Sequence, residues 1–188
     1  MNRRDVIKRT AVLMGGIVSA PTIMAIMKGC KAKPTVDWKP AFFTEDQAIT
    51  ITEIAEIIIP ATDTPGAKDV GVPAFIEEMI QKVYGQEDRD RFMTGLQSFM
   101  QDAEAKYDDA FIDLEAAEQL EFVKQVHDAA IQENTQKRPF ILIVKELTLT
   151  GFFTSQPGAT EVLQYEAIPG RYFGCKPLSE VGGKTWAT

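Results

Sequence analysis

Apolar side chains recur every three or four positions between Thr44 and Ser155, and proline and glycine residues interrupt this pattern at intervals. A repeat close to 3.6 residues places these side chains on one face of an α-helix, and that face has to be buried against other helices. The interruptions divide the chain into five expected helices, at about residues 44–59, 73–84, 88–107, 113–133 and 139–155. The sequence therefore predicts an all-α fold, a single helical-bundle domain of about five helices.

Local signals support the two ends of the first helix. Thr44 and Gln47 form a capping-box pattern, and Pro60 ends the helix because it cannot continue the hydrogen-bond ladder. The isoleucines of this segment are β-branched, so a strand is the competing interpretation. Polar residues at helical spacing among them favour the helix.

The second and fifth helices differ in how much of their surface is apolar. The second begins at Pro73, carries Val83 on its apolar face and is expected to end at Gly85 as a C-terminal cap. The fifth has an almost unbroken apolar run over residues 140–144, which indicates burial on nearly all sides. We therefore expect the fifth helix to lie at the centre of the bundle.

The chain ends in a long irregular, aromatic-rich C-terminal tail, with clustered proline and glycine and a short helix expected at residues 159–163. Its aromatic side chains are expected to divide between the domain core and a partner surface; alternatively, all of them pin the tail to its own bundle. The loop 60–73 is a second segment in which we look for an interface. The candidate interface residues are Phe152, Phe153, Tyr165, Pro169, Tyr172, Phe173 and Cys175.

Residues 1–29 have the pattern of an export signal, with a basic start, an apolar run at 11–27 and a small residue at the exit. A membrane anchor is the alternative, but 17 residues rich in glycine, serine and proline make a short and poor span. The start resembles the twin-arginine translocation pattern, which exports proteins already folded. The residues that carry this resemblance are Arg3, Arg4, Val6, Ile7 and Lys8.

Residues 30–43 are expected to be a tether between this signal and the helical domain, residues 44–188. Gly29 and Cys30 resemble a lipobox, which would anchor the chain to a membrane through a lipidated Cys30, although Lys28 departs from the usual pattern. The alternative is an ordinary cysteine. If Cys30 is lipidated, Cys175 is left single, as a buried thiol or as a bridge to another chain.

The charge of the chain excludes one class of partner. Residues 1–29 carry five basic residues and one acidic residue, so their removal changes the formal net charge from −7 to −11. Nucleic-acid binding depends on clustered lysine and arginine, so no nucleic-acid partner is expected.

No catalytic, cofactor-binding or metal-ligating residues are expected. His127 is the one histidine, and catalysis requires positioned partners. The chain lacks a zinc-ligand cluster, a haem-attachment motif and a dinucleotide-binding glycine motif. Asp63 and Asp69 are expected to bond to the nearby backbone of a turn rather than to bind calcium. Export in a folded state, without a cofactor site, indicates that the chain travels with a cofactor-bearing partner.

Two stretches resemble the gluconate 2-dehydrogenase subunit 3 family: "IIIPATDTPGAKDVGVPAFIEEMI" at 57–80 and "LTLTGFFTSQPGATEVLQYEAIPGRYFGC" at 147–175. The resemblance implies a non-catalytic accessory subunit of a periplasmic or membrane-associated sugar or polyol dehydrogenase. It implies a large partner subunit of the glucose–methanol–choline type that holds FAD, and a third, cytochrome c subunit with haem c. It also implies that this chain supplies the export signal and assists maturation of its partner. The alternative is a free-standing exported lipoprotein that binds a ligand or a partner.

Overall fold

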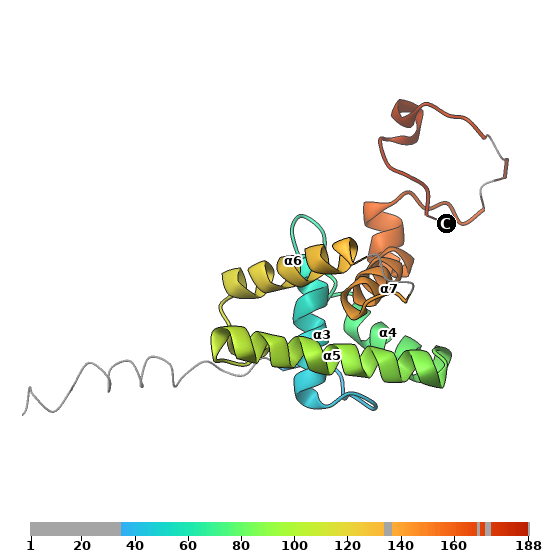
Figure 1. The fold of residues 1–188 in the computed structure, drawn as a ribbon. Coiled ribbons are helices and arrows are strands. Elements are labelled where there is room, and N and C mark those ends of the chain that lie inside the picture. The colour runs from blue at the N-terminus through green and yellow to red at the C-terminus, as the bar shows by residue number, and fades with distance from the viewer. Residues whose placement is uncertain (1–34, 134–136, 169, 172–173, 188) are drawn as a thin grey trace, which may run out of the picture. The chain divides into compact units, whose positions relative to one another are not determined.

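The computed structural model describes residues 35–133, 137–168, 170–171 and 174–187, and these residues contain helices and no strand (Figure 1). The prediction of an all-α fold is confirmed. The elements are α3 (Glu45–Ile58), α4 (Val72–Glu78), η1 (Met79–Val83), α5 (Gln86–Tyr107), η2 (Phe111–Asp113), α6 (Ala116–Gln132), α7 (Phe140–Thr154), η3 (Gly158–Val162) and η4 (Leu178–Val181).

The predicted capping box begins α3. The backbone N–H of Gln47 donates to Thr44 Oγ1 at 3.3 Å, and the backbone N–H of Thr44 donates to Gln47 Oε1 at 3.0 Å. These two bonds satisfy groups that have no partner inside the helix. The helix ends at Ile58, before Pro60, and its middle, residues 48–52, is buried on all sides.

The second predicted helix changes geometry halfway, at the junction of α4 and the π-helix η1. The backbone N–H of Tyr84 donates to the carbonyl oxygen of Met79, five residues earlier, at 3.1 Å. The wider turn rotates the residues that follow onto a different face. Val83 is consequently 66% exposed, and its predicted place on the apolar face is wrong.

Gly85 does not cap the second helix. Its backbone is extended, with φ −63° and ψ 162°, and it precedes α5 as the N-terminal cap. The guanidinium of Arg89 instead binds carbonyl oxygens at the end of η1: those of Ile80 at 3.2 Å, Gln81 at 2.8 Å and Tyr84 at 3.2 Å. A cation at a helix C-terminus is electrostatically favoured, so an arginine from the next helix replaces the predicted glycine cap.

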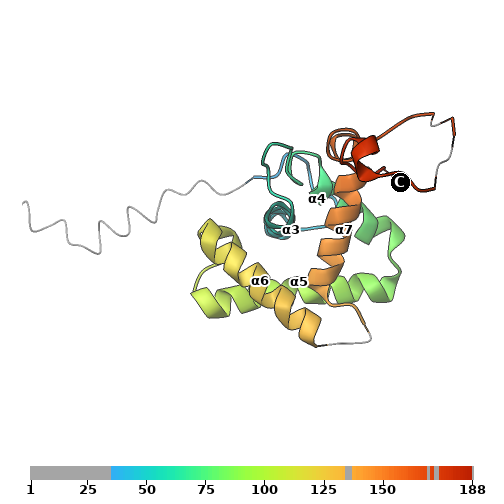
Figure 2. The same cartoon turned by 90° about the horizontal axis from the view of Figure 1, so that it is seen from above.

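The central position predicted for the fifth helix is confirmed, because α7 contacts α3, α4, α5 and α6. Figures 1 and 2 show it beside α4. Phe140 at its start packs on Phe92 and Phe99 of α5, with ring centroids 5.0 and 5.8 Å apart. Phe99 also packs on Phe122 of α6 at 4.9 Å. These aromatic contacts join three helices in one core.

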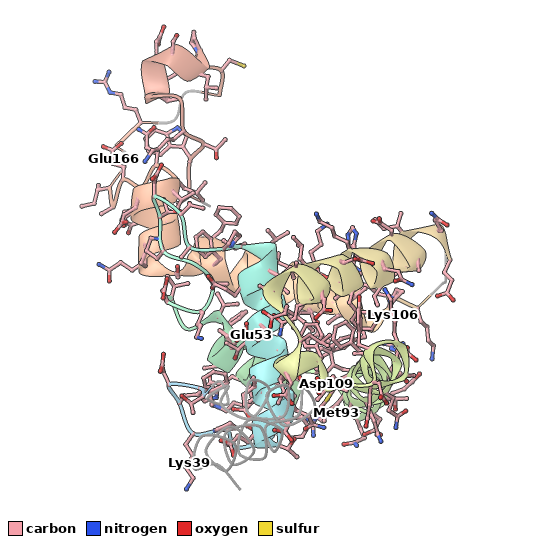
Figure 3. All side chains as sticks on the ribbon, turned by 90° about the vertical axis from the view of Figure 1, so that its left-hand side faces the viewer. Lys39, Glu53, Met93, Lys106, Asp109 and Glu166 are labelled. Carbon is pink, nitrogen blue, oxygen red and sulfur yellow. The ribbon has the colours of Figure 1, made fainter. Side chains whose placement is uncertain are left out.

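The described part of the segment predicted as a tether, residues 35–43, is attached to the bundle by Glu77 of α4. Glu77 Oε1 accepts the backbone N–H groups of Ala41 at 3.0 Å, Phe42 at 2.8 Å and Phe43 at 2.8 Å. Its Oε2 accepts the indole N–H of Trp38 at 3.3 Å. Glu77 and Phe43 are buried, whereas Lys39 is exposed on the same segment (Figure 3).

The four donors also set the protonation of this carboxylate. Burial alone would raise the pKa of Glu77, because it penalises the charged form. The N–H groups around it outweigh burial and hold the pKa below its ordinary value of 4.5. The ionised carboxylate therefore stabilises the fold above pH 4.5, and this contribution is lost as the pH falls through the lowered pKa.

We expect Glu77→Gln to lower the free energy of unfolding by about 1.5–3 kcal/mol at neutral pH, since hydrogen bonds to a charged group are lost and a carboxamide N–H meets other donors. The matched control is Glu78→Gln at the adjacent, exposed position, which pairs only with Lys82 at 3.0 Å and should change stability by less than about 0.5 kcal/mol. Urea unfolding measures both. The difference in unfolding free energy between wild type and Glu77→Gln should shrink as the pH is lowered below 4.5. A difference that is constant with pH would contradict a stabilising role of the ionised carboxylate.

Candidate partner-binding site

A tight turn after α7 directs the chain into what we call the C-terminal arm, residues 158–187. The carbonyl oxygen of Phe152 accepts the backbone N–H of Ser155 at 3.1 Å and its hydroxyl at 2.6 Å. Ser155 Oγ in turn accepts the backbone N–H of Gly158 at 3.2 Å. A Cβ at Gly158 would overlap the carbonyl oxygen of Phe152, so the turn requires glycine at this position.

The C-terminal arm closes on itself through an isolated parallel bridge between Gln164 and Trp186. The backbone N–H of Gln164 donates to the Thr185 carbonyl at 2.8 Å, and that of Ala187 donates to the Gln164 carbonyl at 2.8 Å. The chain between these residues leaves the bridge and returns to it, as the orange-to-red trace in Figure 1 shows. A loop with its ends held together has less conformational entropy to lose when it binds.

Large apolar side chains point away from the core along this arm. Ile168 is 84% exposed, and Tyr165, Leu178 and Trp186 are also exposed. Glu166, which lies among them, marks the arm in Figure 3. Single exposed apolar residues are ordinary, but several on one closed loop are typical of a surface that a partner covers.

The structure divides the predicted interface residues between core and surface. Phe152 is only 2% exposed, so it belongs to the core and is not open to a partner. Its ring packs edge-on against Phe153, at 5.3 Å, and Phe153 is exposed, as are Tyr165 and Cys175. The remaining candidates, Pro169, Tyr172 and Phe173, lie outside the described residues, as do the export-signal residues and Cys30.

Sequence reasoning did not place Ile168, Leu178 and Trp186 among the interface candidates. The missed signal is that each of these apolar residues lies in a segment without a helical period, with proline or glycine nearby. Such a residue has no helix face to bury it. Exposed apolar side chains along the tail thus include these three residues as well as the predicted candidates Phe153 and Tyr165.

Glu56 organises the loop between α3 and α4 by accepting hydrogen bonds from its backbone. The Glu56 carboxylate accepts the backbone N–H of Ala61 at 2.9 Å and of Lys68 at 3.1 Å. The backbone N–H of Gly66 donates to Asp69 Oδ2 at 2.9 Å, which is the turn chemistry predicted for this loop. A Cβ at Gly66 would lie 2.5 Å from Glu56 Oε1 and 2.7 Å from the Ala61 nitrogen.

The described part of the chain contains no group of three or more histidine, cysteine, aspartate or glutamate side chains arranged to hold a metal ion. Within the same residues, no helix is long and apolar enough to cross a membrane. His127 lies on α6 with Nδ1 3.2 Å from Asp128 Oδ1 and Nε2 2.9 Å from Lys145 Nζ.

The described residues form a small all-α protein whose C-terminal arm exposes several apolar side chains. The chain belongs to the gluconate 2-dehydrogenase subunit 3 family, whose model matches residues 45–170. The match starts at the first residue of α3 and ends at residue 170, within the first half of the C-terminal arm. No curated protein and no solved structure gives a significant match. The family is one of subunits of an oxidoreductase complex.

We expect Gly66→Ala to lower the free energy of unfolding by about 1–3 kcal/mol, because the new methyl group collides with both the Glu56 carboxylate and the Ala61 backbone. Gly85→Ser is the control: its Cβ would meet nothing within 4 Å, and serine is a good N-terminal cap for α5. Thermal unfolding of both variants measures the difference. Equal melting temperatures for wild type and Gly66→Ala would show that the loop tolerates a side chain there.

Proposed function

We propose that this chain is the non-catalytic small subunit of a flavin-dependent sugar or polyol dehydrogenase, and that it supplies the export signal and assists maturation of the FAD-bearing catalytic subunit. The match of residues 45–170 to a dehydrogenase subunit family carries this proposal. The basic and apolar start lies wholly outside the matched residues. In this proposal it acts as a signal ahead of the family domain.

The export route explains why the two proteins travel together. The twin-arginine pathway accepts folded proteins, so a flavoprotein can take up FAD before it crosses the membrane while bound to a chain that bears the signal. Arg3 and Arg4 address the complex to the translocase, and the periplasmic side is its destination. A lipidated Cys30 would hold the complex at the membrane, and a cytochrome c subunit would receive its electrons.

Docking through the C-terminal arm fits this role. The arm presents exposed apolar side chains on a loop that is already closed, so its ordering cost on binding is reduced. The bundle supports the arm through the turn at Phe152 and Ser155. A partner that covers the arm would bury Ile168, Leu178 and Trp186, which water surrounds in the isolated chain.

We expect Arg3→Lys with Arg4→Lys to remove both this chain and its flavin-bearing partner from the periplasmic fraction. The reason is that the paired guanidinium groups are the feature that the translocase reads. Dehydrogenase activity and bound flavin in each cell fraction are the measurements. Arg9→Lys, outside the pair, is the control and should leave export unchanged. Normal export of the flavin-bearing partner with the double lysine variant would contradict the proposal.

We expect Ile168→Asp with Leu178→Asp to weaken binding to the co-expressed flavin-bearing subunit by about tenfold or more, as substitution of interface anchors does. Both side chains are exposed, so the melting temperature of the free chain should not change. Val83→Asp places one aspartate on an exposed valine outside the arm and serves as the control for a charge at an exposed apolar site. Co-purification measures the complex. Equal yields of complex from wild type, the double aspartate variant and Val83→Asp would show that the arm does not contribute to binding.

A further inference from the structure

A second surface is a groove between α6 and α7, which we call the basic groove. Its floor is formed by Val123 and Ile141, which are buried, and by Leu120, which is exposed. Lys124, His127 and Lys145 line it as well. The groove has a volume of about 200 Å³ and closes against the C-terminal end of α3.

The two lysines of the basic groove have no carboxylate partner among the described residues. Lys145 Nζ lies 2.9 Å from His127 Nε2, and a neutral imidazole accepts that bond without neutralising the charge. Lys124 makes no hydrogen bond or ion pair in the described part of the chain. Of the carboxylates nearest in sequence on α6, Glu121 pairs with Lys106 at 3.6 Å, and Asp128 contacts His127 of the groove at 3.2 Å without reaching either lysine within ion-pair distance.

Several other cations on the bundle are paired with carboxylates, whereas Lys124 and Lys145, like Lys39 and Lys68, are not paired within the described residues. Lys82, Arg91, Lys106, Lys137 and Arg138 each have an aspartate or glutamate within ion-pair distance. The chain as a whole carries a formal charge of −7. Two lysines without a carboxylate, beside an apolar floor on an acidic protein, are complementary to an anionic group that is attached to an apolar body.

The face of α6 that lines the groove continues past it to Ile131, and an elongated occupant such as a helix could cover this whole face. Leu120, Lys124, His127 and Ile131 follow one another at spacings of four, three and four residues, so they share one face of α6. Leu120 and Ile131 are exposed at the two ends of this stripe. Eleven residues at 1.5 Å each give a length of about 16 Å, or three helical turns. An amphipathic helix laid in a groove uses apolar anchors at this spacing.

We propose that the basic groove binds an amphipathic α-helix of the catalytic dehydrogenase subunit, whose apolar face covers Leu120 and Ile131 and whose aspartate or glutamate side chains pair with Lys124 and Lys145. The inference rests on the proposed function for the identity of the partner. The apolar contact supplies the burial, and the two ion pairs fix the register of the helix along α6. The groove is a contact separate from the C-terminal arm.

The test co-expresses the full chain with the flavin-bearing subunit and compares Lys124→Glu/Lys145→Glu with Lys39→Glu/Lys82→Glu. Both double variants change the net charge by the same amount, and Lys39 and Lys82 lie outside the groove. We expect the groove variant to bind at least about tenfold more weakly and the control to bind like wild type. Wild-type affinity should also fall as salt is added, and the groove variant should lose much of this dependence.

Circular dichroism of each purified chain checks that it is folded, and Lys124→Glu alone, at an exposed position, serves if the double variant does not fold. Undiminished binding by the folded groove variant would overturn the inference and leave the proposed function intact. An equal loss in the control would also overturn it, because net charge would then be the cause. A wild-type chain that does not bind the flavoprotein at all would overturn both the inference and the proposed function.

Discussion

The buried carboxylate of Glu77 is the contact that joins the start of the domain to the bundle. It accepts three consecutive backbone N–H groups and the indole N–H of Trp38, all from the segment before α3. A buried charge is costly unless hydrogen bonds compensate for it, and here four donors do so. Because Phe43 is thereby fixed against Phe92, with ring centroids 6.2 Å apart, the entry to α3 and the start of α5 are set together.

Glu56 acts in the same way at the other end of α3. Its carboxylate accepts backbone N–H groups from the loop that leads to α4, and Gly66 allows that loop to approach. Irregular backbone next to a core needs partners for its polar groups, and two glutamates on neighbouring helices provide them. The described segments before and after α3 are thus held to the domain by hydrogen bonds, whereas the C-terminal arm keeps several apolar side chains exposed.

The two candidate interaction surfaces differ in their physical character. The arm is a closed loop with exposed Ile168 and Leu178, so water exclusion would dominate its contacts. The basic groove combines a partly apolar surface with Lys124 and Lys145, so its contacts would also depend on charge and salt. A basic site on an acidic chain helps to orient the chain in the field of an anionic partner surface.

The sequence by itself determined the helices, their approximate ends and the central place of α7, because these depend on hydrogen bonds between near neighbours and on the apolar repeat. The capping box at Thr44 was readable for that reason. Only the tertiary structure decided that Glu77 turns inward while Glu78 beside it faces water, and that Phe152 joins the core while Phe153 does not. Adjacent helical residues point about 100° apart, and the direction that becomes buried is set by segments distant in the chain, which no local pattern encodes.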